Sequence, residues 1–162
     1  MSEKEMFLKI KEGEYQTTVR VLKAFPVDKL DFKPHEKSKS ARELAYNFAL
    51  EEKVNMDALA GKVDFSVYGG TPPQNMEEIL ALLDKNHKAS MEAIKGASEE
   101  QVNGMADFGG RPMRIMDIFR AMMLDSIHHR GQFSVYIRLA GGKVPSIYGP
   151  SADEPWDGGK GN

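Results

Sequence analysis

Cysteine is missing from this sequence of 162 residues. Its absence excludes disulfide bonds, thiolate metal sites and a cysteine nucleophile, so any thiol chemistry requires a thiol from outside the chain. The sequence also lacks an apolar run long enough to span a membrane, and it lacks a signal-peptide pattern. We therefore expect a cytoplasmic protein that has no membrane partner.

Neither sign of charge dominates the chain. Its 22 lysines and arginines stand against 24 aspartates and glutamates, which gives a formal net charge of −2. This balance provides no general attraction to the phosphates of nucleic acids, so we expect no nucleic-acid partner. Three common catalytic patterns are absent as well: the phosphate-binding glycine-rich loop, the nucleophile elbow and the HExxH pattern of zinc peptidases.

Hydrophobic periodicity predicts four amphipathic helices in a single domain that spans residues 1–157. The predicted helices cover residues 2–25, 40–59, 75–95 and 112–140. Ser40 and Glu43 form a capping-box pattern at the start of the second helix, and Gly141-Gly142 suits the end of the fourth. The segments between them are interpreted as loops, and the glycine-rich end at residues 158–162 is expected to be disordered.

Four such helices predict an all-α fold, a four-helix bundle with an ordered irregular C-terminal tail. The tail after Gly142 carries Val144, Ile147, Tyr148 and Trp156, which we expect to pack on the bundle. Val63, Phe65 and Val67 alternate with polar residues, but the run is too short to predict a strand.

The fourth helix carries ionisable residues where core residues are expected. Asp125 and His129 lie one turn apart on a stripe that is otherwise mostly apolar. The second helix repeats this feature, because Asn47 and Glu51 lie one turn apart on its inward stripe. Polar groups on a core-facing stripe are costly unless they are paired or bound to a metal. Gly131, inside the fourth helix, predicts the close approach of another helix or a bound group.

These polar residues indicate a shared site, since bundles build metal and ligand sites from facing helices. Asn47, Asp125 and His129 can hold a divalent metal, with Glu51 as a further ligand or general base. Oxygen-rich ligation favours manganese, magnesium or iron, and the imidazole keeps zinc and nickel open. The alternative is a buried ion pair between Asp125 and His129, with Asn47 as a hydrogen-bonding neighbour.

The remaining histidines and the arginines of the fourth helix are weaker candidates. His128 points away from the centre of the stripe, and His87 is interpreted as a packing or rim residue of the third helix. Arg130 and Arg138 are expected to form ion pairs with acidic residues, and the alternative is contact with an anionic substrate.

Three stretches of the chain resemble DinB-like proteins, which belong to the DinB/YfiT-like superfamily of metalloenzymes. The run HHRGQFSVYIRLAGGKVPSIYGPSADEP resembles the C-terminal signature of that family. The run TTVRVLKAFPVDKLDFKPHEKSKSARELAYNFA resembles its first helix, loop and second-helix start, and FGGRPMRIMDIF resembles the approach to its fourth helix.

The resemblance implies an up-down-down-up bundle that assembles as a homodimer. It also implies three metal-binding positions, usually histidines around nickel or zinc, and these fall on Asn47, Asp125 and His129. Relatives of this kind include transferases and isomerases that use a low-molecular-weight thiol such as bacillithiol or mycothiol, and others resemble hydrolases.

Two hypotheses follow. In the first, the chain is a divergent enzyme of the thiol-transferase or hydrolase type, with an Asn/Asp/His metal site. In the second, the site has decayed into a polar cluster, and the bundle acts without catalysis as a binding or stress-response protein that takes a small-molecule ligand.

Overall fold

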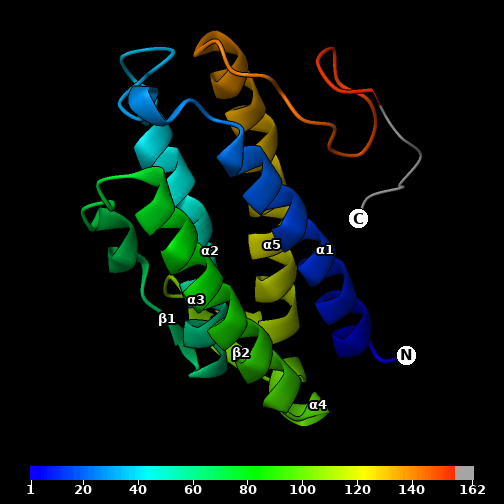
Figure 1. Cartoon of the computed structure of the whole chain (residues 1–162). Coiled ribbons are helices and arrows are strands. Elements are labelled where there is room, and N and C mark those ends of the chain that lie inside the picture. The colour runs from blue at the N-terminus through cyan, green and yellow to red at the C-terminus, as the bar shows by residue number, and fades with distance from the viewer. Residues whose placement is uncertain (156–162) are drawn as a thin grey trace.

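Four long helices make up most of the computed structural model, which describes residues 1–155. They are α1 (Glu3–Lys23), α2 (Ala41–Leu59), α3 (Met76–Gly96) and α5 (Ile115–Leu139). In Figure 1, α1 and α5 run upward and α2 and α3 run downward, and each of α1 and α2 packs against both α3 and α5. Trp156 and the glycine-rich end at residues 158–162 lie outside the described residues.

The ends of these helices follow the predicted sequence signals. Ser40 caps α2, where its side chain accepts from the backbone N–H of Glu43 and the Glu43 carboxylate accepts from the Ser40 N–H, so the predicted capping box is confirmed. Beyond α5, Gly141 has a φ of +85°, a left-handed conformation that glycine adopts without strain. No helix in the described part of the chain is both long and apolar enough to cross a membrane.

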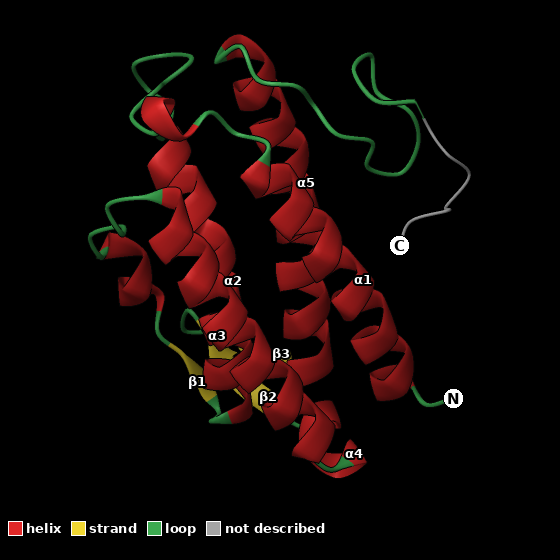
Figure 2. Cartoon of the chain, viewed as in Figure 1, coloured by secondary structure: helices red, strands yellow, loops and turns green. Residues whose placement is uncertain are grey.

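A small sheet corrects the prediction that the fold is purely α. The strands β1 (Lys62–Val63), β2 (Met105–Phe108) and β3 (Pro112–Arg114) lie in the order β1-β2-β3, at the lower end of the bundle in Figure 2. β1 is parallel to β2, and β2 is antiparallel to β3. The segments predicted to be loops also contain a short helix, α4 (Glu99–Asn103), and two 3₁₀ turns, η1 (Val27–Lys29) and η2 (Phe65–Gly69).

A tight turn explains why the fourth long helix begins later than predicted. Gly109 and Gly110 both have positive φ, which is the backbone of a two-residue hairpin turn. The turn pairs Pro112 with Asp107 across β2 and β3, so Pro112 lies in an edge strand rather than in the first turn of a helix. α5 therefore starts at Ile115.

The interior is divided into two hydrophobic clusters. One cluster includes Leu22, Phe48 and Phe133, and the other includes Ile94 and Phe119. Every long helix also contributes buried or partly buried polar side chains. We call this set the polar layer: Lys11, Glu14 and Thr18 of α1; Glu51 and Glu52 of α2; His87 and Ser90 of α3; Asp125, Ser126, His129 and Arg130 of α5.

One buried network in the polar layer joins α1, α2 and α3. Glu52 lies 2.8 Å from Lys11 Nζ through Oε1 and 2.9 Å from His87 Nδ1. His87 Nε2 lies 3.1 Å from Glu12 Oε2, and the Tyr15 ring stacks on the imidazole at 3.7 Å. His87 is thus buried at the centre of a charged cluster, so of the two expected roles it is a packing residue and not a rim residue.

A second network ties the C-terminal tail to the bundle. Arg130 is fully buried and donates to the Glu14 carbonyl oxygen at 3.0 Å and to Thr18 Oγ1 at 3.2 Å. Its guanidinium also pairs with the Glu14 carboxylate and contacts the Tyr148 hydroxyl. Arg138 pairs with Asp153 of the tail at 2.6 Å, so the ion pairs predicted for both arginines are confirmed.

The network around Glu52 predicts an acid-sensitive stability. Burial alone would raise the pKa of Glu52, but Lys11 and His87 outweigh it and lower that pKa to about 2. Because the unfolded state binds this proton near pH 4.5, the free energy of unfolding should fall as the pH drops from about 4.5 toward 2.

Glu52→Gln should cost about 3–5 kcal/mol at pH 7, since it leaves Lys11 buried without its partner. Urea denaturation across this pH range measures both effects. The exposed Glu92→Gln is the control, and equal losses in the two variants would contradict the account.

Candidate metal centre

The facing stripes of α2 and α5 bring three ligating side chains together in the polar layer. Glu51 comes from the middle of α2, and Asp125 and His129 come from successive turns of α5. One carboxylate oxygen of each acid and one ring nitrogen of His129 all lie within 4.8 Å of one another. Two oxygens and one nitrogen at this spacing can be bridged by a single divalent cation.

Glu51 is the most unusual member of this group. Its side chain is only 3% exposed, and neither carboxylate oxygen has a hydrogen-bond partner among the described residues. Burial raises the pKa of Glu51 well above its ordinary value, and the negative charge of Asp125 adds to the rise. The Ser126 hydroxyl offsets part of it, although the two side chains form no hydrogen bond of standard geometry. A cation beside this carboxylate would remove the cost of burying it.

The other two ligating groups reach solvent, so the site opens on the α5 side. The side chains of Asp125 and His129 are 43% and 20% exposed, and His129 Nε2 lies 3.5 Å from Asp125 Oδ2. The second ring nitrogen, Nδ1, lies 3.2 Å from Gln132 Oε1. A hydrogen bond from Nδ1 to Gln132 leaves Nε2 free to coordinate a metal and fixes the orientation of the ring.

Asn47, a ligand predicted from the sequence, lies one turn before Glu51 on α2. It is buried, and its Oδ1 accepts from Lys39 Nζ at 3.0 Å. The amide oxygen is therefore engaged with an ammonium group. The three side chains whose spacing suits a metal are Glu51, Asp125 and His129. The sequence indicated Glu51 as an additional ligand or general base.

The structure adds one residue that the sequence did not indicate. Tyr68 is partly buried, and the pKa of its hydroxyl is raised by this burial and by the negative charges of Glu51 and Asp125. Tyr68 lies in η2, within a segment that we interpreted as a loop, and carries no periodic signal that links it to the site. Phe65 and Phe108 contact each other beside it, with ring centroids 4.9 Å apart.

The structure tests what the sequence predicted for two further residues of α5, His128 and Gly131. His128 is exposed, in agreement with its position away from the stripe. No atom of the described residues comes within 4 Å of a Cβ placed on Gly131, so no other helix of the same chain approaches it and that part of the expectation is wrong. Gly131 faces solvent on the outer side of α5.

Comparison with known proteins gives one family and a consistent fold. A sequence model described as the DinB family matches residues 1–158. The chain is 32% identical over 77 residues to the uncharacterised protein YrdA of Bacillus subtilis strain 168. That alignment covers 45% of this chain and 46% of YrdA, so the chain matches about half the length of this curated relative.

Solved structures share the fold at low sequence identity. A DinB-like protein from Bacillus cereus has a TM-score of 0.79 and 23% identity over 89% of this chain and 97% of that chain. A DinB-like protein from Bacillus subtilis, YjoA, has a TM-score of 0.71 and 20% identity, covering 93% and 99%. A conserved protein from Enterococcus faecalis has a TM-score of 0.58 and 18% identity, covering 86% and 97%. At these identities the likeness concerns the fold alone.

The raised pKa of Glu51 predicts that the metal-free protein loses stability as the pH rises. The folded state holds this proton above pH 4.5 while the unfolded state releases it, so the free energy of unfolding should fall above that pH. Glu51→Gln keeps the shape without the charge and should raise stability at pH 8 by about 1–3 kcal/mol, with little change at pH 4. Urea denaturation in the presence of a chelator measures this difference. Equal effects of Glu51→Gln at both pH values would mean that Glu51 is hydrated as an ordinary surface carboxylate.

Proposed function

Because this chain belongs to the DinB family, we propose that it is a divergent metal-dependent enzyme with a divalent ion bound by Glu51, Asp125 and His129. The observation that carries the proposal is the buried carboxylate of Glu51, which has no hydrogen-bond partner in residues 1–155 and lies within 4.8 Å of the ligating atoms of Asp125 and His129. Two carboxylates and one imidazole suit manganese, nickel or zinc. The chemistry would be that of a thiol transferase or a hydrolase.

Each residue has a defined part in this proposal. A bound divalent ion supplies a lowered pKa for a coordinated water or thiol, which provides a nucleophile near neutral pH. Asp125 and His129 hold the solvent-facing side, where a substrate approaches, and Gln132 orients the imidazole. Glu51 is the internal ligand and the group placed to accept a proton. Since the chain has no cysteine, a thiol substrate would be a low-molecular-weight thiol.

Asn47 stays a predicted ligand. It lies on the same stripe as Glu51, and its amide oxygen becomes available only if Lys39 releases it. A substitution of Lys39 therefore distinguishes a metal site that includes Asn47 from one made only of Glu51, Asp125 and His129. It frees the Asn47 amide oxygen and leaves Glu51 unchanged.

A second function is favoured by the direct contact between Asp125 and His129. Their 3.5 Å separation is that of an ion pair, which satisfies both groups without a metal. In this alternative the site has decayed, and the protein acts without catalysis, as a binding or stress-response protein with a small-molecule ligand.

The metal site is tested with protein that has been purified without a chelator and then dialysed against manganese, nickel or zinc. We expect about one ion per chain by elemental analysis, and loss of at least about 90% of it in His129→Ala, which removes the nitrogen ligand. His128→Ala is the matched control, because the neighbouring imidazole is exposed and lies outside the group. Equal metal content in the two variants would reject the assignment and favour the decayed site.

We also propose the up-down-down-up bundle and the homodimer that the resemblance implies, for a single domain of residues 1–157 in the cytoplasm. The outer face of α5 supports the dimer. Leu124, Val135 and Leu139 are largely exposed on one side of this helix, and Gly131 lies between them with open space above it.

The pattern on this face suits a two-fold axis near Gly131. A second copy of α5 that crosses antiparallel at this glycine would place Ile127 against Val135, because each lies four residues from Gly131, with Leu124 and Leu139 toward the two ends of the contact. The glycine lets the two backbones approach, and the four apolar side chains leave water together. A stable dimer buries about 800 Å² on each partner.

The dimer is tested with Val135→Glu, which places a charge in the centre of this face. We expect the mass in solution, measured by light scattering, to fall from that of two chains to that of one. Val27→Glu is the control, because Val27 is also exposed but lies in η1 and not on the outer face of α5. A wild-type protein that is monomeric at micromolar concentration would refute the dimer.

A further inference from the structure

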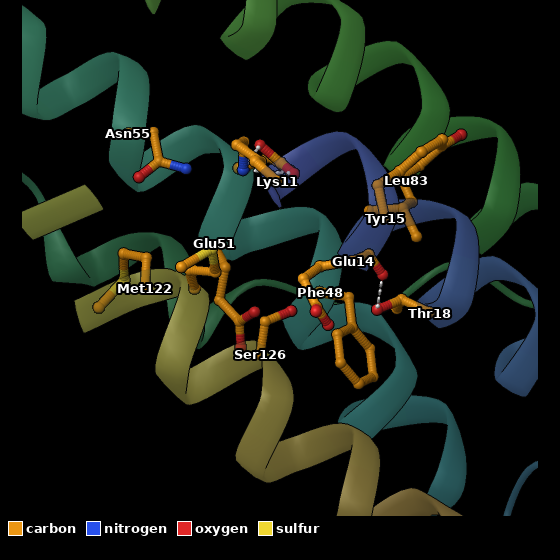
Figure 3. Close-up of a pocket in the computed structure, with 12 residues that line it drawn as sticks. Lys11, Glu14, Tyr15, Thr18, Phe48, Glu51, Asn55, Leu83, Met122 and Ser126 are labelled. Carbon is orange, nitrogen blue, oxygen red and sulfur yellow. Dashed lines mark hydrogen bonds and ion pairs between the residues drawn. The ribbon is translucent and has the colours of Figure 1, made fainter. Parts of the chain in front are cut away.

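A small cavity lies beside Glu51, between the helices of the bundle. Side chains of all four long helices line it, including Leu83 of α3, and Figure 3 shows Glu51 and Ser126 pointing toward each other. The centres of water molecules can occupy about 30 Å³ of it. One water requires about 10–15 Å³ by this measure, so the cavity has room for two waters and for no thiol or larger ligand.

The walls of the cavity carry acceptors that the protein leaves unsatisfied. Both oxygens of Glu51 and the Oδ1 of Asn55 lack hydrogen-bond partners within residues 1–155. Asn55 is only 1% exposed and lies one turn beyond Glu51 on α2, and the Ser126 hydroxyl faces the same space from α5. Unsatisfied buried acceptors are costly, and a water with two or more such partners is held as part of the structure.

A route to the surface passes one flexible side chain. Met123 lines the cavity and also lines a separate surface groove between α1 and α5, together with Met6, Ile10 and Arg120. The unbranched methionine side chain changes rotamer easily, so Met123 can open and close a path between the groove and the cavity.

We propose that the cavity beside Glu51 is an internal site for two water molecules, bound by Glu51, Asn55 and Ser126, which exchange with the surface past Met123. The site stands independently of the metal, because its acceptors and its volume belong to the protein alone. If the proposed function holds as well, water reaches Glu51 from inside the bundle while the substrate occupies the solvent side at Asp125. Such a supply favours hydrolysis over thiol transfer.

The water site is tested on the metal-free protein by magnetic relaxation dispersion of ¹⁷O and ²H, which counts long-lived internal waters. We expect about two such waters in the wild type and about one in Asn55→Leu, which removes one acceptor at similar volume. Ser90→Ala is the matched control, because Ser90 Oγ is another unsatisfied buried oxygen but does not line the cavity. A wild type without long-lived waters overturns the site, as does a count that Asn55→Leu and Ser90→Ala change equally.

The route is tested by the exchange rate of the same waters. Met123→Ala should shorten their residence time at least about tenfold, whereas the exposed Met105→Ala should leave it unchanged. An unchanged residence time in Met123→Ala overturns the gate. Both measurements use metal-free protein, so a failure to bind metal would reject the proposed function and leave the water site standing.

Discussion

The burial of the Glu51 carboxylate is the constraint on which the candidate site depends. A carboxylate that is removed from water without partners costs several kcal/mol, and a folded protein tolerates this only if a proton, a cation or water offsets it. Glu51 lies within 4.8 Å of ligating atoms of Asp125 and His129, and it also lines a cavity with room for two waters. Burial raises the pKa of Glu51, and the proposed metal site rests on the same buried carboxylate.

Glu52, the residue after Glu51, is a buried carboxylate of the polar layer that does have partners. Glu52 is almost as buried as Glu51, yet Lys11 and His87 hold its pKa at about 2, while burial raises the pKa of Glu51. Consecutive residues of a helix point about 100° apart, so α2 directs one acid into a structural ion-pair network and the other toward α5. The two glutamates therefore have different surroundings. Glu52 joins α1 and α3 to α2, and Glu51 lies beside Asp125 and His129 without a hydrogen-bond partner among the described residues.

Helical spacing alone placed Glu51, Asp125 and His129 on inward stripes of two helices, because a period of 3.6 residues fixes which side chains share a face. It could not find the sheet, since strands of two to four residues show too little alternation and Pro112 suits either a helix start or an edge strand. The Gly109-Gly110 turn was the overlooked hairpin signal. Tyr68 and the Lys39 contact of Asn47 depend on long-range packing that no local pattern encodes.

Anomalous X-ray diffraction at a metal absorption edge tests the central claim most directly, on crystals grown with manganese, nickel or zinc. The account predicts one strong anomalous peak about 2.0–2.2 Å from an oxygen of Glu51, an oxygen of Asp125 and a ring nitrogen of His129. A peak bound elsewhere, or Asp125 and His129 still paired directly with no peak between α2 and α5, would contradict it.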